Sequence, residues 1–468
     1  MPLLHPDRLF PADPGTRTIA RALFEQIEHA PIISPHGHCD PAWFASNEAF
    51  PDPAQLFVVP DHYIFRMLVS QGVALEELGV PRADGGPTET DPRKIWELFA
   101  SHYHLFRGTP TRAWIDHSFE TLFGISERLS ADNAERYYDL IAERLKGDDF
   151  RPRALFDQFN IALLATTDGA LDDLSHHSAI AQSGWNGRIV PTYRPDACVD
   201  PEFAGFANNV MQLGALTGQD TTHWKGYLAA HRARRAFFRT LGCTATDHGH
   251  PTALTADLNK ADASGLFTRC LAGQASAADA ETFRAQMLTE MARMSAKDGL
   301  TMQIHAGSVR NHSPLVHAKF GRDKGFDIPQ PTNYVEALRP LLNSVGLEPG
   351  LKIVLFTLDE TVYSRELAPL AGTYPSLTLG PPWWFYDSFE GMMRFREATG
   401  ETAGIYNTAG FDDDTRAFCS IPARHDVARR TDCAWLATLV SDHRIELDEA
   451  HEMAQALTAD LAKTAYRL

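Results

Sequence analysis

The sequence lacks any run of about 18 apolar residues, the length that a membrane-spanning helix requires. Its first stretch, MPLLHPDRLFPADPGT, is interrupted by prolines and has no apolar segment of the kind found in a signal peptide. The 6 cysteines are scattered along 468 residues, and no two form a C-x-x-C pair. These absences predict a cytoplasmic protein with reduced thiols, no disulfide framework and no membrane contact.

Positive charge is also scarce, because 43 Lys and Arg residues face 60 Asp and Glu residues. The net charge is −17 at pH 7, and no block rich in lysine or arginine stands out. Nucleic acids and anionic membranes bind basic surfaces, so neither is an expected partner. An anionic substrate would have to be bound by individual arginines, which draws attention to any arginine beside a candidate site.

After about residue 155, short apolar runs alternate with segments of helical periodicity. Such alternation implies a parallel α/β sheet covered on both faces. With PIISP near the start, eight runs predict a (β/α)8 barrel of the TIM type. A doubly wound open sheet is the alternative, but the sequence has no G-x-G-x-x-G and no P-loop. The eight runs span residues 31–35, 161–168, 187–196, 242–249, 299–307, 351–360, 376–384 and 403–410.

Residues 45–155 interrupt this alternation, because they carry helical patterns almost throughout. In TDPRKIWELFASHYHLF, for example, Asp91 is a suitable N-cap and Pro92 a suitable first helical residue. We therefore predict three parts. They are residues 1–44 with the first strand, an all-helical insertion domain at 45–155, and the remainder of the barrel with C-terminal helices at 156–468.

Two histidines one residue apart, His36 and His38, follow the first predicted strand in ISPHGHCDP. Side chains at positions i and i+2 of an extended segment point to the same side, so two imidazoles can aim at one point. Taken alone, this pattern does not distinguish two ligands of one metal ion from two polar residues that leave a strand.

The other predicted strand ends carry polar or aromatic residues as well. In a barrel of this kind the catalytic groups lie at the C-terminal ends of the strands. Any one of these residues could simply cap the next helix, but a full set is harder to explain in that way. In chain order they are Thr167 and Asp168, Arg194 and Asp196, Asp247 and His248, His305 and Arg310, Asp359 and Glu360, Trp383 and Trp384, and Asp412, Asp413, Asp414 and Arg416.

A metal site is the simplest use of such a set. Three imidazoles and one carboxylate suit a borderline divalent ion such as zinc, with one position left for water or substrate. His36, His38, His305 and an aspartate after the eighth strand would form this set if the barrel closes. No lysine ends the fourth strand and no histidine ends the sixth, so we expect one ion rather than two.

Several uncommon stretches resemble the uronate isomerase family of the amidohydrolase superfamily, and the resemblance covers essentially the whole chain. It implies interconversion of D-glucuronate and D-fructuronate, and of D-galacturonate and D-tagaturonate, in hexuronate catabolism. The ending RHDVARR departs from the family's usual aromatic-containing form at Val427 and Ala428, which bears only on packing behind the site. The stretches are ISPHGHCDP, PDHYIFRML, PTYRPD, DHGH, MQIHAGSVRNHS, PPWWFYDSFEGM and DDDTRAFCSIPARHDVARR.

The resemblance implies catalytic roles for four residues. The D-x-R spacing to Arg416 selects Asp414, among three adjacent aspartates, as the metal-side carboxylate and the candidate base. His62 and Tyr63 in PDHYIF would assist proton transfer, although the sequence by itself places them in the core at the start of a helix. Arg416 would stabilise enediolate charge, because a guanidinium does not deprotonate.

The resemblance implies that Arg194 and Arg416 face the substrate, and the C6 carboxylate of a uronate needs a cation. Arg194 and Arg310 can each supply a bidentate contact to the C6 carboxylate. Trp384, with its neighbour Trp383, would pack against the sugar, although a place in the core explains these tryptophans equally well.

Two other functions remain open at this point. A metal-dependent hydrolase or decarboxylase of the same superfamily would share the metal ligands, and a sugar-acid binding protein would share the pocket without needing a base. The many exposed helices of a barrel are also compatible with a homo-oligomer.

Overall fold

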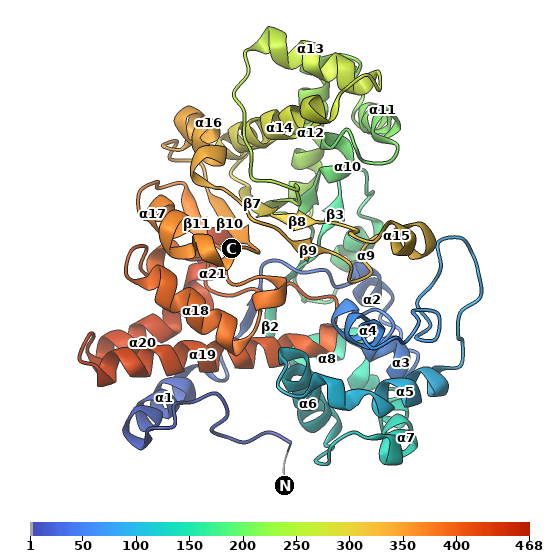
Figure 1. Ribbon diagram of the computed structural model, residues 1–468, viewed down its shortest axis with the longest axis vertical. Helices are drawn as coiled ribbons and strands as arrows, with labels where there is room; N and C mark the ends of the chain where they lie inside the picture. Colours follow the sequence, from blue (N-terminus) through green and yellow to red (C-terminus); the bar gives the residue numbers. More distant parts are fainter. Residues whose placement is uncertain (1–2) are drawn as a thin grey trace.

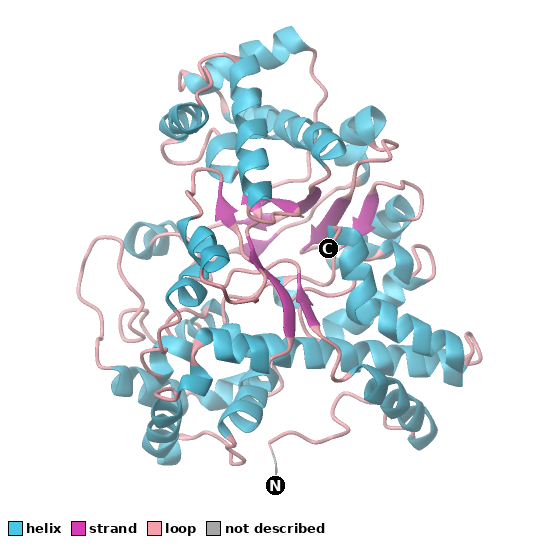
Figure 2. Ribbon diagram, turned by 180° about the vertical axis from the view of Figure 1, so that it is seen from behind, coloured by secondary structure: helices cyan, strands magenta, loops and turns pink. Residues whose placement is uncertain are grey.

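The computed structural model describes residues 3–468 (Figure 1). The strands lie at the centre of the molecule, and helices surround them when the chain is seen from either side (Figures 1 and 2). The strands that correspond to the predicted runs pair in parallel. The molecule is therefore an α/β protein built on parallel sheets.

Nine short strands form two sheets. The smaller sheet has the order β1 (Ile32–Ser34), β2 (Ile161–Ala165) and β4 (Ile189–Val190). The larger sheet has the order β11 (Leu377–Leu379), β10 (Ile353–Thr357), β7 (Thr301–Ala306), β6 (Ala245–His248), β5 (Tyr193–Arg194) and β3 (Asp168–Gly169).

Neighbouring strands follow the order of the chain. β2 and β3 belong to one predicted run and β4 and β5 to the next, so these two runs connect the sheets. Each of the first seven predicted runs contains at least one strand. This succession of parallel neighbours is the one expected around a barrel.

The prediction of an eighth strand at 403–410 is wrong. A 3-10 turn (Ile405–Asn407) occupies its middle, and a single parallel bridge joins Leu379 to Thr408. The cause is local, because Gly404 and Gly410 have φ of 67° and 75°, in the left-handed region that ends extended structure. Across residues 3–468 no strand pairing joins this run to β1.

Between β1 and β2, the regular elements that the structure describes are all helical. Several of these helices begin with the same local device, an aspartate N-cap followed by proline, as at Asp91 and Pro92, whose role as cap and first residue is confirmed. The α-helices are α2 (Pro41–Ser46), α3 (Pro53–Phe57), α4 (His62–Val69), α5 (Pro92–Ser101), α6 (Pro110–Phe123), α7 (Ala134–Arg144) and α8 (Pro152–Gln158).

These helices gather on one side of the molecule (Figure 1). Their buried core, which includes Trp96, Phe99 and Phe119, is continuous with Ile32 of β1 and Ile161 of β2. The helical segment is thus packed directly onto the strands from which it departs.

The remaining helices cover the sheets. Among residues 3–468, no helix is both long and apolar enough to cross a bilayer. α1 (Pro14–Ile27) packs against the long helix α19 (Ile421–Ser441). The others are α9 (Ser175–Gln182), α10 (Asp196–Val199), α11 (Phe206–Thr217), α12 (Trp224–Thr240), α13 (Lys260–Leu271), α14 (Ala277–Asp298), α16 (Val335–Val345), α17 (Ala368–Ala371), α18 (Phe389–Gly400), α20 (Leu447–Gln455) and α21 (Leu461–Tyr466).

One excursion was not predicted. Directly after β7 the chain forms an antiparallel pair, β8 (Ser308–Val309) with β9 (Ile328–Pro329), and α15 (Pro314–Phe320) lies between them. Strands of two residues leave no periodic pattern in the sequence.

Candidate active site

A cavity of about 400 Å³ lies at the C-terminal ends of the parallel strands. Every residue proposed for the site from the sequence lines it, although the residues come from distant parts of the chain. They are His36, His38, His62, Tyr63, Arg194, His305, Arg310, Trp384, Asp414 and Arg416. The cavity is also lined by three residues of the unpredicted excursion, Arg322, Asp323 and Asp327.

The two histidines after β1 face one carboxylate. Nε2 of His36 lies 3.4 Å from Oδ1 of Asp414, and Nε2 of His38 lies 3.0 Å from the same oxygen. Yet Asp414 Oδ1 is buried and accepts no hydrogen bond of ordinary geometry within residues 3–468. Short distances without a hydrogen bond are expected where three potential metal-ligand atoms face one point.

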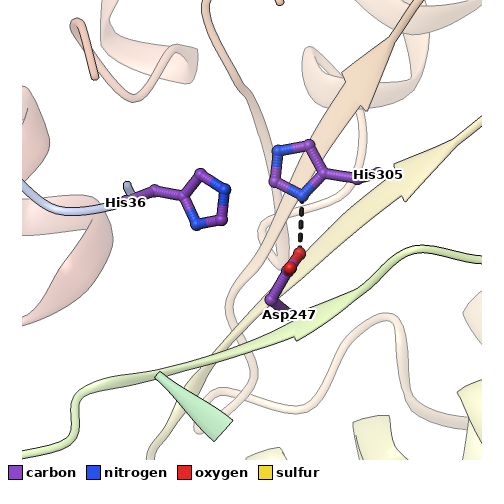
Figure 3. Close-up of side chains that lie close together, drawn as sticks. All are labelled: His36, Asp247 and His305. Atoms are coloured by element: carbon purple, nitrogen blue, oxygen red, sulfur yellow. Dashed lines mark hydrogen bonds and ion pairs between the residues drawn. The ribbon is translucent and has the colours of Figure 1, made fainter. Parts of the chain in front are cut away.

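A second group adjoins the first and shares His36 with it (Figure 3). Nδ1 of His305, on β7, lies 2.6 Å from Oδ1 of Asp247, on the neighbouring strand β6. The ring of His305 stacks on that of His36 with 4.6 Å between centroids. Nε2 of His305 is buried without a partner in the described part of the chain, so it is available as a ligand.

Both groups fit a divalent metal ion. In each, three nitrogen or oxygen ligand atoms lie within 4.8 Å of one another: His36, His38 and Asp414 in one, and His36, Asp247 and His305 in the other. A histidine that binds a metal through one ring nitrogen usually donates the N–H of the other to a partner such as a carboxylate. The buried atoms that lack hydrogen-bond partners are accounted for if an ion binds between them.

The electrostatics of the cavity also favour a cation. Burial lowers the pKa of His36, but the carboxylates around it, Asp414 foremost, outweigh this effect and raise that pKa to about 9. Burial raises the pKa of Asp247, but Arg194 and His305 outweigh it and hold that pKa well below its usual range. The pocket thus contains fixed negative charge that a proton or a metal ion compensates.

The three adjacent aspartates have different surroundings. Asp413 is buried, and its Oδ2 lies 3.1 Å from Nε2 of His425. Asp412 is buried, which raises its pKa well above the usual range. Asp414 has φ of 36°, so its backbone is in the left-handed region that is uncommon for residues other than glycine. Strained backbone of this kind is concentrated at functional sites.

His62 and Tyr63 reach the cavity from the helical segment. They begin α4, whose N-cap Asp61 accepts a hydrogen bond from the backbone N–H of Tyr63 at 2.8 Å. Burial, reinforced by Arg416, lowers the pKa of His62 to about 3, so its imidazole is neutral near pH 7. Burial raises the pKa of the Tyr63 phenol above its usual range, and Arg424 opposes this rise.

The two arginines considered for the substrate carboxylate are held differently. Arg194 forms close ion pairs, with Nε 2.8 Å from Asp196 Oδ2 and Nη1 3.0 Å from Asp247 Oδ2. Within the described chain, the ion pairs of Arg310 are longer, at 3.6 Å to Asp327 and 4.0 Å to Asp323. The guanidinium of Arg310 therefore has more capacity left for a ligand.

The aromatic wall completes the cavity. The guanidinium carbon of Arg310 lies 5.7 Å from the ring centroid of Trp384, which also packs against His62 at 5.5 Å. Trp383 packs edge to face on His305, with 4.7 Å between centroids. Arg416 lies 3.3 Å from Asp323 across the mouth.

Asp247 and the residues of the unpredicted excursion were not recognised from the sequence as part of this site. Asp247 was noted at a strand end but was not distinguished as a partner of the histidines, because that depends on the pairing of β6 with β7. Asp323 lies in the excursion between β8 and β9, where no sequence pattern marks it.

Comparison with known proteins agrees with this geometry. The family profile described as glucuronate isomerase matches residues 15–465. The uronate isomerase of Rhizobium meliloti is 62% identical over 466 residues, covering 100% of this chain and 99% of that protein.

Solved structures give the same result. The crystal structure of glucuronate isomerase from Caulobacter crescentus has a TM-score of 0.98 at 57% identity, covering 100% of this chain and 98% of that one. Uronate isomerase from Thermotoga maritima has a TM-score of 0.91 at 26% identity, covering 99% of both chains. A putative metal-dependent hydrolase from Lactobacillus casei, 15% identical with a TM-score of 0.54 and coverage of 95% and 97%, shares the fold. With the family profile and these relatives spanning almost its entire length, the chain belongs to the glucuronate isomerase family.

Proposed function

We propose that this cavity interconverts D-glucuronate and D-fructuronate, and D-galacturonate and D-tagaturonate, as an aldose–ketose isomerase of hexuronate catabolism. The observation that carries the proposal is the convergence of His36, His38 and Asp414 on one point beside two arginines, in a chain of this family. The proposal includes closure of the parallel strands into a barrel, with residues 45–155 as its insertion domain.

One divalent ion, zinc by the mixture of nitrogen and oxygen ligands, would be held by His36, His38, Asp414 and Nε2 of His305. When bound, it supplies Lewis-acid stabilisation for the oxygen atoms next to the reacting carbons. Asp247 would orient His305 through the hydrogen bond to Nδ1.

The isomerisation moves protons without net oxidation. A base removes the proton from C2 of the aldehyde form, and the electron pair makes an enediolate. A proton returned to C1, together with transfer of the C2 hydroxyl proton to the oxygen on C1, gives the ketose. We assign the base to Asp414, which retains a negative charge because the histidines hold its pKa well below the usual range against the effect of burial.

Tyr63 and His62 would relay protons to and from the sugar oxygens, and Arg416 would stabilise the enediolate. The neutral His62 can accept one hydrogen bond and donate one in this role, and the phenol of Tyr63 can do the same. Arg416 lines the cavity 3.3 Å from Asp323, and its guanidinium can donate charged hydrogen bonds to an enediolate oxygen.

The C6 carboxylate would bind Arg310, with Arg194 as a second donor and Trp384 packed against the sugar ring or chain. The free donors of Arg310 and its place over Trp384 support this assignment. Such a contact explains how a protein of net charge −17 can bind an anion.

The decisive experiment is incubation of the metal-loaded protein with D-glucuronate, with the ketose detected by chromatography or NMR. A metal-dependent hydrolase or decarboxylase would release a fragment or carbon dioxide, and a binding protein would return the sugar unchanged. Formation of D-fructuronate at a catalytic rate supports the proposal, and recovery of unchanged glucuronate would overturn it.

A further inference from the structure

Arg424 lies beside the phenol of Tyr63, although the two come from opposite ends of the chain. Its side chain is 1% exposed and extends from the first turn of α19. The guanidinium carbon lies 5.1 Å from the centroid of the Tyr63 ring and 3.6 Å from that of the Trp114 ring. Tyr63 and Trp114 themselves pack edge to face at 5.4 Å. The phenol thus has an indole and a guanidinium as its neighbours.

Hydrogen bonds and an ion pair hold the guanidinium of Arg424 in place. Nη1 forms an ion pair with Asp387 and donates to the backbone oxygen of Asp413 at 3.4 Å, and Nε donates to Ser420 at 3.1 Å. Asp387 follows the tryptophan pair after β11, and Asp413 directly precedes Asp414. Arg424 therefore connects two loops of the active site to the helical segment that carries Tyr63.

Stability alone explains this arrangement poorly. A fully buried ion pair is often no more stable than well-packed apolar residues of the same volume. Within residues 3–468, Nη2 of Arg424 and Nε1 of Trp114 are buried without hydrogen-bond partners, which adds to the cost. A buried cation that faces a proposed proton-transfer group calls for a functional explanation.

We propose that Arg424 is a positioning residue for Tyr63. It holds the phenol in the orientation required for proton transfer, and its positive charge stabilises the phenolate character that develops on the ring oxygen. The inference rests on the role proposed above for Tyr63. Proton transfer is steeply dependent on geometry, and a displacement of about 1 Å can cost on the order of 10²-fold in rate. A fixed cation in a site that excludes water is effective at stabilising developing negative charge.

Arg424→Gln tests the proposal, and Arg396→Gln is its matched control. Arg396, on α18, forms a comparable buried ion pair with Asp432 of α19, at 2.7 Å, and does not contact Tyr63. We expect Arg424→Gln to lower kcat with glucuronate by about 10²-fold, with KM and metal content little changed. Arg396→Gln should retain the kcat of the wild type in its folded, metal-loaded fraction.

A double-mutant cycle separates positioning from a general structural effect. In a Tyr63→Phe background, Arg424→Gln should cause little further loss of kcat, because the group on which it acts is absent. If Tyr63→Phe alone is slow and the two losses multiply in full, the proposal for Arg424 is overturned while the role of Tyr63 stands. If Tyr63→Phe retains the kcat of the wild type, the proposed role of Tyr63 fails and this inference fails with it.

Should Arg424→Gln not fold, Arg424→Lys provides the same cycle. Lysine keeps the positive charge but loses the planar contact with Trp114 and the separate hydrogen bonds of Nε and Nη1. It should lower kcat less than loss of the charge would, and again only when Tyr63 is present. Equal kcat values for Arg424→Lys and the wild type would show that no oriented guanidinium is needed and would overturn the positioning role.

Discussion

Nδ1 of His305 lies 2.6 Å from Oδ1 of Asp247, while Nε2 of the same ring points to no partner within residues 3–468. The hydrogen bond fixes the ring so that its free nitrogen faces the side of the cavity where His36 lies (Figure 3). This relationship between neighbouring strands leads to the first prediction.

Replacing Asp247 by asparagine should weaken metal binding by about 10- to 100-fold, because the ring of His305 loses the carboxylate that orients it. Zinc affinity can be measured by competition with a chromophoric chelator. Asp168→Asn is a suitable control, since Asp168 is a buried strand-end carboxylate that accepts from Thr166 at 2.7 Å and belongs to neither candidate metal group. Equal zinc affinities for Asp247→Asn and the wild type would contradict the prediction.

The double substitution His36→Ala with His38→Ala should abolish stoichiometric zinc binding, since it removes both imidazoles that face Asp414. Metal per chain is determined by atomic emission after dialysis. The chain supplies its own control, because His102 and His104 have the same H-x-H spacing at the end of α5 and are not among the residues that line the cavity. Retention of one ion per chain in the His36/His38 variant would exclude these residues as the principal ligands.

Asp414→Asn should remain slow even when its metal site is filled. Asparagine keeps the shape of the side chain but has no basic carboxylate, so kcat should fall by roughly 10² or more at saturating zinc. In heavy water, the proton-transfer route also predicts deuterium at C1 of the product. Full recovery of kcat on addition of zinc would show that Asp414 serves only as a ligand, and would shift the base to Tyr63 or His62.

Arg310→Met and Arg194→Met should behave differently. Loss of Arg310 should lower kcat/KM for uronates by about tenfold or more while metal content stays unchanged, because its ion pairs are long. Loss of Arg194 should lower both kcat/KM and metal content. The buried carboxylate of Asp247 would then lack the counter-ion that lies 3.0 Å away. Both quantities are read from steady-state kinetics and metal analysis of the same samples. An unchanged kcat/KM in Arg310→Met would assign the carboxylate to Arg194.

Acid should destabilise the fold through His231 of α12. Its ring is buried, Nδ1 lies 2.7 Å from the hydroxyl of Tyr193, and burial lowers its pKa to about 3. In the unfolded chain the pKa of a histidine is about 6.5. A histidine whose pKa is lowered by folding contributes stability above that pH and loses it as the pH falls toward the folded pKa.

From about pH 7 to about pH 5, this one group should remove about 2 kcal/mol from the free energy of unfolding. Urea unfolding at the two pH values measures the change. His231→Gln should show a smaller dependence on pH, whereas His29→Gln, at a site 91% exposed, should retain that of the wild type. Identical pH dependence in His231→Gln and the wild type would contradict the assignment.

Several features of this site could be predicted because they are local. The spacing of His36 and His38 places two imidazoles on one side of an extended segment whatever the rest of the chain does. The N-cap at Asp91 likewise depends on neighbouring residues alone. The strand predicted at 403–410 does not form for a local reason, since Gly404 and Gly410, near its two ends, have positive φ.

Other features depend on packing that no single segment encodes. Asp247 meets His305 only through the register of β6 with β7. Tyr63 is 7% exposed, so its interpretation as a core residue agreed with its burial and missed only that the core there adjoins the cavity. Asp323 reaches the mouth through an excursion that has two-residue strands at its base.

His62 and Tyr63 belong to α4 and not to a strand. Their positions can therefore change in evolution independently of the candidate metal ligands. The candidate ligands His36, His38 and His305 lie on or beside strands whose hydrogen-bond register fixes them, whereas α4 is oriented by its own cap at Asp61 and by contacts with neighbouring side chains. Small shifts of that helix can alter which sugar and which proton transfer the cavity accepts without disturbing the ligands. A descendant of this chain could therefore acquire a new reaction through changes in one helix, while its candidate metal ligands stay unchanged.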